Sequence, residues 1–436
     1  MRRSIKILAI PVYLATISLL ALWQERLSFL QQLQDSQRDG SMKTGSKKTG
    51  QTVPKRRPEP PGSILGLEDN LVLPPALPNT TKYAGKPKVI ITWTFNFDQS
   101  HLNGCPDWNC QLTADKSRVT DADAIIFYNG YGSPPSPRLP SQYYVFFTQE
   151  SPVHMGAREP YPNFFNLTMG FRRDADLPCP YGYAMRRHHP LPDAEMQEKY
   201  SADAFQNKSK VLAWFASNCG APSKRQDYVK ELKQHMTVDV YGACGELQCA
   251  KDLENTCTKM LGRDYFFYLS LENSICKDYV TEKFWEKGAD AVPVVPIVLQ
   301  RSILEPYAPH HSFIALDDFK SPRELVDYLH KLTSDLRLYA EYFAWRKDYE
   351  IVFLNGRIHD LKERPWGFCR LCKLLWETSE PQGPRPQRTV NLQEFWVQKN
   401  GCDQSLVGKL LQKGAPVEAT TEKEKSEKKI VESSEE

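Results

Sequence analysis

Short apolar runs, separated by polar segments, recur along the middle of the chain. Two groups of these runs are rich in β-branched and aromatic residues and have the length of buried strands. The first group is Val89 to Thr94, Asp123 to Tyr128 and Tyr143 to Phe147, and the second is Lys210 to Phe215, Val238 to Tyr241, Tyr265 to Leu271, Ala291 to Val295 (before Pro296) and Phe313 to Leu316. Helical or loop segments lie between the runs, so the pattern predicts an α/β fold in two halves with parallel pairing.

The chain around the third strand of the second group carries the most chemistry. A polar loop follows that strand, and Asp278 to Trp285 then predicts a helix that Asp278 caps, with Glu282 in the first turn. With the next strand this makes a βαβ unit, which places ligands at the carboxyl ends of its strands. Carboxylates and amides suit sugar hydroxyls, and an ammonium group suits phosphate. The side chains here that fit a nucleotide sugar are Glu272, Asn273, Tyr279, Glu282 and Lys283.

The segments between and after the strands predict two further helices and one irregular region. Ser223 to His235 is the first helix. Ser321 to Arg346 is the second, and it opens with a capping box, Ser321 to Glu324, that has proline at the first helical position. The region from Tyr161 to Pro190 is rich in tyrosine, arginine and proline and is expected to be irregular.

Both ends of the chain differ in composition from the middle. Residues 1–6 are basic, and residues 7–23 are almost entirely apolar, which fits either a cleaved signal peptide or a membrane-spanning helix. The apolar run is long and has no small-residue cleavage pattern, so an uncleaved signal-anchor with a cytoplasmic tail at 1–6 is favoured. Residues 24–85 are expected to be a stem and linker, and residues 414–436 a disordered tail.

Composition and charge narrow the class of protein. The 436 residues suffice for two domains, and the net charge of +3 argues against a nucleic-acid-binding protein. Eleven cysteines indicate an oxidising compartment and leave at least one thiol free or paired between chains. Cys105 and Cys110 are close enough for a local disulfide, whereas Cys369 and Cys372 fit a disulfide better than a zinc site. A further cluster consists of Cys244, Cys249 and Cys257.

Four segments occur in an order that is typical of one enzyme family. They are Phe147 to Pro152 (FTQESP), Phe165 to Asp174 (FNLTMGFRRD), Ala216 to Cys219 leading to Arg225, and Phe267 to Trp285 (FYLSLENSICKDYVTEKFW). The last resembles the signature of the α1,3-fucosyltransferases of glycosyltransferase family 10, although Leu271 replaces a phenylalanine that is frequent there. The matches extend from about Lys88 to Arg364 and cover most of the expected folded region.

The resemblance implies a GT-B fold, in which two Rossmann-like domains face a cleft. With it, we expect an acceptor-side domain at 86–200, a GDP-fucose-binding domain at 201–365 and a cysteine-containing extension at 366–413. It also implies a single-pass type II Golgi membrane protein with a lumenal catalytic region, in agreement with the favoured signal-anchor.

The expected reaction is the inverting transfer of L-fucose from GDP-fucose to the 3-hydroxyl of GlcNAc. The C-terminal Cys-x-x-Cys and extension are similar to those of the plant and invertebrate enzymes that modify the innermost (core) GlcNAc of N-glycans. The expected partners are therefore GDP-fucose, an N-glycan on a glycoprotein and the Golgi membrane, with no nucleic acid. Two alternatives stay open: a Lewis-type enzyme that acts on antenna LacNAc, and an inactive lumenal glycan-binding protein.

The resemblance also implies roles for single residues. Glu150 is the expected catalytic base, because inverting transfer needs a group that takes the proton of the attacking hydroxyl. By its position alone, Glu150 is a surface glutamate in a turn. Arg225 and Lys283 are expected at the diphosphate, whose negative charge grows as GDP leaves. The full set expected to bind GDP-fucose is Asn218, Arg225, Asn273, Tyr279, Glu282 and Lys283.

Two Asp-x-Asp pairs, Asp121 with Asp123 and Asp174 with Asp176, match the pattern that holds a divalent metal in other glycosyltransferases. The implied fold uses arginine and lysine instead, so we expect no metal site and no required cofactor, with stimulation by Mn²⁺ left open. Arg172, Arg173 and Asp174 could shape the acceptor side, reach the phosphates or form a structural ion-pair network. The sequons for N-glycosylation are at Asn79, Asn166 and Asn207.

Overall fold

The computed structural model describes residues 59–67, 71–76, 85–103, 105, 107–130, 132–136, 138–155, 163–249, 256–289, 292–356, 361–378 and 389–413. These residues all belong to one compact unit, Pro58–Glu436. The predicted cytoplasmic tail, signal-anchor, first part of the stem, Asn79 and C-terminal tail lie outside the described residues. Within the described ranges, no helix is both long enough and apolar enough to span a bilayer.

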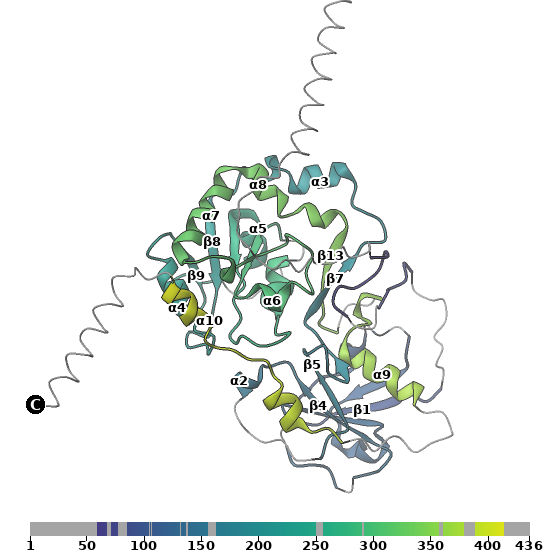
Figure 1. Cartoon of the computed structure of the whole chain (residues 1–436). Coiled ribbons are helices and arrows are strands. Elements are labelled where there is room, and N and C mark those ends of the chain that lie inside the picture. The colour runs from purple at the N-terminus through teal and green to yellow at the C-terminus, as the bar shows by residue number, and fades with distance from the viewer. Residues whose placement is uncertain are drawn as a thin grey trace, which may run out of the picture. The chain divides into compact units, whose positions relative to one another are not determined.

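The first half of the described chain forms a six-stranded parallel sheet. Its strands are β1 (Lys88–Thr92), β2 (Cys110–Thr113), β3 (Ala124–Tyr128), β4 (Tyr143–Thr148), β5 (Leu167–Gly170) and β6 (Leu177–Pro178), in the order β2-β1-β3-β4-β5-β6 (Figure 1). The central strands β3 and β4 are buried along nearly their whole length because both faces of the sheet are covered. Short helices flank these strands: η1 (Gln99–Leu102), η2 (Lys116–Asp121) and α2 (Pro152–Met155). The later helix α9 (Gly367–Glu377) also packs on this sheet.

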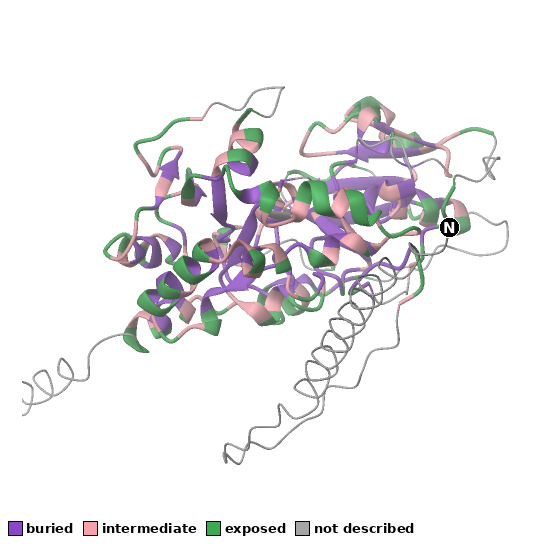
Figure 2. Cartoon of the chain, turned by 90° about the horizontal axis from the view of Figure 1, so that it is seen from above, coloured by how far each residue is buried: buried purple, intermediate pink, exposed green. Residues whose placement is uncertain are grey.

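The second half forms a five-stranded parallel sheet, as the apolar pattern predicts. Its strands are β8 (Lys210–Phe215), β9 (Asp239–Tyr241), β10 (Tyr265–Leu269), β11 (Val295–Val298) and β12 (Ile314–Ala315), in the order β12-β11-β10-β8-β9. The helices of this half are α3 (Asp193–Tyr200), η3 (Asp203–Phe205), α4 (Arg225–Leu232), α5 (Thr256–Asp264), α6 (Arg301–Leu304), η5 (Leu316–Asp318), α7 (Pro322–Ser334), α8 (Leu336–Glu341) and η6 (Ala344–Lys347). The strands of both sheets are buried, and exposed residues lie mainly on helices and loops (Figure 2).

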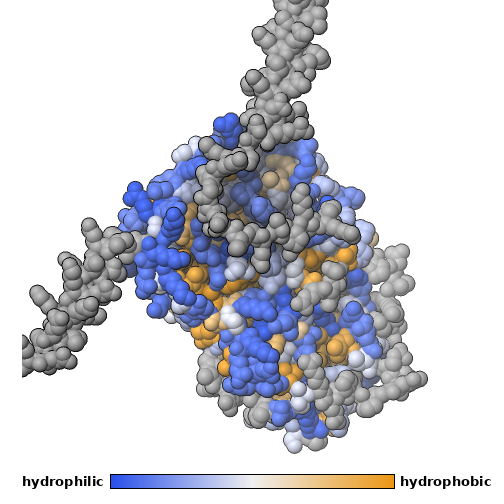
Figure 3. Space-filling view, in the orientation of Figure 1, coloured by the Kyte–Doolittle hydropathy of each residue, from blue (hydrophilic) through white to orange (hydrophobic). Residues whose placement is uncertain are grey.

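Several elements connect or cover these sheets. Strand β7 (Gly182–Arg186) pairs antiparallel with β13 (Tyr349–Phe353). The remaining helical segments are η4 (Lys283–Ala289), η7 (Leu361–Glu363), η8 (Gln393–Gln398) and α10 (Leu406–Lys413). In the space-filling view the visible face is mostly hydrophilic, with smaller hydrophobic patches between the polar side chains (Figure 3).

Two sequence-based expectations that concern strands are wrong in detail. The region from Tyr161 to Pro190 is not irregular, because it contains β5, β6 and β7, which are too short to form a recognisable pattern. The strand expected to end before Pro296 instead runs from Val295 to Val298, and Ser270 N donates to Ile297 O at 2.8 Å.

The long helix expected at the end of the second half is divided. It breaks at Asp335, which has extended backbone angles and caps the second piece, α8. The predicted cap at the start is confirmed in part: Glu324 N donates to Ser321 Oγ at 3.2 Å. The Glu324 carboxylate, however, accepts from Lys320 N at 2.7 Å instead of from Ser321 N, so the reciprocal half of the box is displaced by one residue.

Ten of the eleven cysteines, all of which are described, form disulfides. The pairs are Cys105–Cys369, Cys110–Cys372, Cys219–Cys244, Cys249–Cys257 and Cys276–Cys402. The expected local bridge between Cys105 and Cys110 is therefore wrong. Both residues face α9, which returns to this sheet from more than 250 residues away in sequence. The leftover thiol is Cys179, and burial raises its pKa to about 12.

Candidate active site

The polar residues after β10 lie on an irregular loop, 270–282, and not on a helix. The predicted cap, Asp278, has a left-handed backbone (φ 61°), and the helical segment η4 begins only at Lys283. The Asp278 carboxylate accepts from Arg173 N at 3.1 Å and from the Tyr307 hydroxyl. Asp278 thus binds groups distant in sequence instead of starting a helix, and the prediction of a helix start is wrong.

Glu272 braces this loop from inside. Its carboxylate accepts from Thr281 N at 2.7 Å and from Thr281 Oγ1 at 2.9 Å, and Lys283 Nζ lies 3.3 Å away. Burial raises the pKa of Glu272, and the positive charge of Lys283 opposes that rise. The Glu272 carboxylate therefore holds the loop closed, and the positive charge of Lys283 compensates its negative charge.

Lys283 bridges two acidic side chains. Its Nζ donates to Glu282 Oε1 and to Thr281 Oγ1, each at 2.9 Å. Burial tends to lower the pKa of Lys283, but the charges of Glu272 and Glu282 outweigh it and raise the pKa. Burial alone would raise the pKa of Glu282, but the positive charge of Lys283 outweighs this effect and lowers that pKa. Glu272, Glu282 and Lys283 form one charged cluster, in which about a fifth of the Lys283 side chain is exposed.

Arg225 lies at the start of α4, beneath the same loop. Its Nη1 donates to Leu271 O, and its Nη2 donates to Asn218 O at 3.2 Å. Its Nε is buried and has no hydrogen-bond partner in the described part of the chain. Burial lowers the pKa of Arg225, whereas the charge of Glu272 acts to raise it. Arg225 therefore ties the loop after β8 to the loop after β10.

Asn218 itself lies in the loop after β8, and its Oδ1 accepts from Gly220 N at 3.2 Å. The same loop is joined to the 270–282 loop a second time through Ser223. Ser223 Oγ donates to Glu272 O at 2.7 Å, and Ser223 N donates to Asn273 O at 2.9 Å. The Oδ1 atom of Asn273 is buried and unpartnered among the described residues.

Glu150 comes from the other sheet, two residues after the end of β4. The Tyr279 hydroxyl donates to Glu150 Oε2 at 3.5 Å. Burial raises the pKa of Tyr279, and the charges of Glu272, Glu150 and Glu282 add to this rise, in that order. Next to this contact, the buried hydroxyls of Ser151 and Ser274 are 2.7 Å apart. The carboxyl end of β4 and the 270–282 loop are therefore in direct contact.

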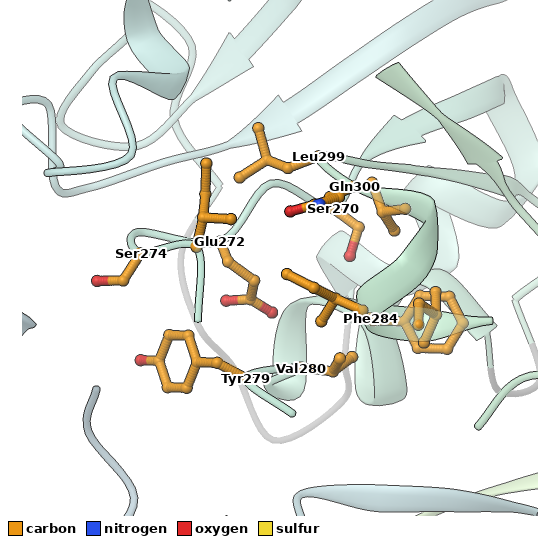
Figure 4. A pocket seen from close by; sticks show the side chains of 12 residues that line it. Ser270, Glu272, Ser274, Tyr279, Val280, Phe284, Leu299 and Gln300 are labelled. Carbon is orange, nitrogen blue, oxygen red and sulfur yellow. The ribbon is translucent and has the colours of Figure 1, made fainter. Parts of the chain in front are cut away.

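A narrow pocket lies beneath the loop (Figure 4). In that view the Glu272 carboxylate points toward the middle of the pocket, between Tyr279 and Val280 on one side and Leu299 on the other. The open volume is about 30 Å³. Ligand pockets usually enclose about 300–1,000 Å³, so this one is an internal space under the loop and not a whole nucleotide-sugar site.

Three of the four Asp-x-Asp carboxylates, those of Asp123, Asp174 and Asp176, accept hydrogen bonds from protein groups. Asp123 accepts from Val89 N at 2.9 Å, and Asp176 accepts from Thr168 N at 2.9 Å. Asp174 forms two hydrogen bonds with Arg172, at 2.8 and 2.7 Å, and an ion pair with Lys277 at 3.1 Å. The ion-pair alternative for Arg172 and Asp174 is therefore correct. Within the described ranges, no group of three or more histidine, cysteine, aspartate or glutamate side chains is placed to hold a metal.

The two described sequons differ in exposure. Asn207 is exposed. Asn166 is buried, and its Oδ1 accepts from Tyr144 N at 2.7 Å and from Arg138 Nη2 at 2.9 Å. Because a glycan would be attached to the Nδ2 atom of this buried side chain, we expect Asn166 to carry none.

Sequence reasoning missed the groups that join the two sheets. Ser151, Ser274 and Tyr181 were not singled out, although the Tyr181 hydroxyl donates to Gln149 O at 2.7 Å, next to Glu150. The sequence could have pointed to Ser151 and Ser274, because they stand within the segments Glu-Ser-Pro and Glu-Asn-Ser. The hydrogen-bond partner of a serine hydroxyl, however, cannot be identified from sequence alone. Phe171, which packs on Tyr279 with ring centroids 4.8 Å apart, likewise reads as a core residue.

Comparison with known proteins identifies similar sequences along most of the folded chain. Residues 205–392 match the model described as "Glycosyltransferase family 10 (fucosyltransferase) C-term", and residues 85–182 match "Fucosyltransferase, N-terminal". The chain is 42% identical to "Alpha-(1,3)-fucosyltransferase fut-1" of Caenorhabditis elegans, over 75% of this chain and 73% of the relative.

Two further relatives are less similar. The chain is 36% identical to "Glycoprotein 3-alpha-L-fucosyltransferase A" of Drosophila melanogaster, over 68% of this chain and 56% of the relative. It is 34% identical to "3-galactosyl-N-acetylglucosaminide 4-alpha-L-fucosyltransferase FUT3" of Bos taurus, over 72% of this chain and 82% of the relative.

Proposed function

Because the chain belongs to glycosyltransferase family 10, the fucosyltransferases, we propose that it transfers L-fucose from GDP-fucose to the 3-hydroxyl of GlcNAc, with inversion at the fucose C1 atom. The proposed acceptor is the innermost GlcNAc of an N-glycan on a glycoprotein. The main support is the contact between Glu150 and the 270–282 loop, because it brings a carboxylate from the first sheet to the residues proposed to hold the donor.

In the proposed reaction Glu150 removes the proton from the acceptor 3-hydroxyl as its oxygen attacks C1 of fucose. The bond between C1 and the diphosphate oxygen breaks, and the electron pair leaves with GDP. Lys283 and Arg225 stabilise the growing negative charge of the diphosphate. Asn218, Asn273, Tyr279 and Glu282 complete the donor site, and the hydroxyl of Tyr279 also holds Glu150 in place.

The two parallel sheets support a GT-B arrangement, with the acceptor on the side of the first sheet and the donor on the side of the second. We propose that no metal is required, since fixed cations take the place of a divalent ion at the diphosphate, and that Mn²⁺ at most stimulates transfer. The proposed location is the Golgi membrane, with residues 7–23 as a type II signal-anchor.

The alternative acceptor is antenna LacNAc. The name of the similar Bos taurus protein, which specifies a galactosylated GlcNAc, keeps this candidate open. The core acceptor is preferred because the more similar sequences are the Caenorhabditis and Drosophila relatives, of which the latter is named for action on glycoproteins.

An acceptor competition tests the proposal. The purified full chain, in detergent, is incubated with GDP-fucose and equal amounts of an N-glycopeptide with an unfucosylated core and a LacNAc oligosaccharide. Mass-spectrometric fragmentation then locates the added fucose. Fucose on the innermost GlcNAc is the expected result. Fucose on LacNAc alone overturns the core acceptor, and no incorporation into either overturns the transferase proposal.

A further inference from the structure

The C-terminal segment 389–413, hereafter the strap, connects the two sheets. Its first part packs on the first sheet: Val390 N donates to Phe165 O at 2.9 Å, and the Trp396 ring packs edge-on against Phe146, with centroids 5.7 Å apart. Its last part is α10, whose Val407 and Leu410 are buried in the same core as α4. In Figure 1 the yellow strap runs from a short helix beside β4 to α10 beside α4.

Between these ends, residues 402–404 of the strap are bonded to the 270–282 loop. Cys402 forms a disulfide with Cys276. Gln404 Oε1 accepts from Ile275 N at 3.2 Å, and Gln404 Nε2 donates to Ile275 O at 3.0 Å. Asp403 N donates to the same carbonyl at 2.9 Å. The Gln404 amide thus pairs with both backbone groups of one loop residue, as a neighbouring strand would.

The bonded residues lie at the centre of the loop, between Asn273 and Tyr279. Next to these bonds, Ile275, Lys277 and Asp278 border a cavity of about 360 Å³, which Gly401 and Asp403 of the strap also line. A segment that borders open space has few packing contacts there to fix its backbone, so bonds to the strap carry more of the restraint. The strap also reaches Tyr279 through an aromatic stack, because Trp396 packs on Phe171 at 5.5 Å and Phe171 packs on Tyr279 at 4.8 Å.

We propose that Gln404 and the Cys276–Cys402 disulfide are positioning groups that hold the 270–282 loop in the conformation that binds GDP-fucose. The inference rests on the proposed function. Neither group is among the residues proposed to bind the donor. Both act through the backbone at residues 275 and 276, which fixes the places of Asn273 on one side and Tyr279 on the other. Small displacements of positioned groups reduce binding or rate by large factors.

Two independent changes test the role in the full chain. One is Gln404→Ala, which keeps the disulfide, and the other is the double change Cys276→Ala with Cys402→Ala. In each variant we expect the KM for GDP-fucose, and the Kd for GDP measured by calorimetry, to rise about tenfold. The acceptor KM should stay within about twofold, since the loop is on the donor side.

The matched control is Cys249→Ala with Cys257→Ala, which also removes a disulfide, but one that joins Cys249 to α5 and not the strap to the loop. It should leave the Kd for GDP unchanged. A lowered Tm with unchanged GDP affinity in both test variants would mean that the strap is only a structural staple, and an equal loss of affinity in the control would also overturn the proposal. A wild-type chain that binds GDP without transferring fucose refutes the proposed function but not the positioning role. One that binds no GDP refutes both.

Discussion

Replacing Lys283 by methionine removes the positive charge that neutralises Glu272. In the folded chain Lys283 Nζ lies 3.3 Å from Glu272 Oε2 and 2.9 Å from Glu282 Oε1. The side chain of Glu272 is 11% exposed and that of Glu282 is 42% exposed, so the loss falls mainly on Glu272, whose charge water screens less. Hydrogen bonds to buried charged groups contribute about 1.5–3 kcal/mol, and we expect the free energy of unfolding at pH 7.5 to fall by about 2–3 kcal/mol.

The free energy of unfolding that Lys283→Met loses should depend on pH. Burial raises the pKa of Glu272 in the folded chain, and Lys283 limits that rise. Without Lys283 the folded pKa moves further above the unfolded value, so the variant loses stability as pH rises through the folded pKa and regains it as pH falls toward the unfolded one. The difference between wild type and variant should therefore shrink from pH 7.5 to pH 5. In the variant Lys283 no longer opposes the effect of burial on the pKa of Glu282, so that pKa also rises and Glu282 changes the stability difference in the same direction.

The assay is urea unfolding of the detergent-solubilised full chain, followed by tryptophan fluorescence. Lys287→Met is the matched control: Lys287 is on the same helical segment, is similarly exposed, and bonds Glu286 Oε1 and Thr258 Oγ1, each at 3.0 Å. Neither Glu286 nor Thr258 is buried, so Lys287→Met should lower the free energy of unfolding by less than about 1 kcal/mol at both pH values. Equal losses in the two variants, or a Lys283→Met deficit that grows on acidification, would refute the reasoning.

Two further predictions concern covalent features. The Cys105–Cys369 and Cys110–Cys372 bridges close nearly the same loop, with sequence separations of 264 and 262, so either one alone keeps it closed. Chain entropy then predicts a loss of about 2–3 kcal/mol when alanines replace one pair and about 8 kcal/mol when they replace both, measured by urea unfolding; a double loss equal to the sum of the single losses would contradict this. Peptide mass spectrometry should find a glycan on the exposed Asn207 and none on the buried Asn166, and an occupied Asn166 would show that its side chain is not buried.

The sheets were largely predictable because their strands are continuous apolar runs that need no distant information. Tyr143 to Phe147 and Lys210 to Phe215 are strands within a residue of the expected bounds, since both faces of each sheet are covered and every position favours an apolar side chain. The βαβ connection at 265–298 is also as predicted in its strands, apart from the shift of β11 past Pro296.

The details that failed depend on contacts between distant residues. Asp278 has the composition of a helix cap, but Arg173 N and Tyr307, 105 and 29 residues away, bind its carboxylate and hold it in a left-handed turn. Cys105 could not be paired correctly because the position of α9 is a property of the whole fold. Likewise, nothing in the local pattern of Gln404 indicates that it pairs with Ile275.

Within the candidate site, residue types predicted the members but not their connections. Lys283, Glu282 and Glu272 were singled out, and their grouping into one charged cluster follows from the fold. Arg225 is expected to face a phosphate. In the structure its guanidinium group also donates hydrogen bonds to two backbone carbonyls, and the sequence of the helix alone does not indicate this role.

The most direct test of the proposed reaction is transfer by Glu150→Gln. The amide keeps the size of the side chain and its contact with Tyr279 but cannot accept the acceptor proton. General-base catalysis contributes about 10²–10⁴-fold, so fucose transfer to the N-glycopeptide should fall by that factor while the Kd for GDP, measured by calorimetry, stays unchanged. A variant that binds GDP normally and transfers fucose at the wild-type rate would contradict the assignment of Glu150 as the base.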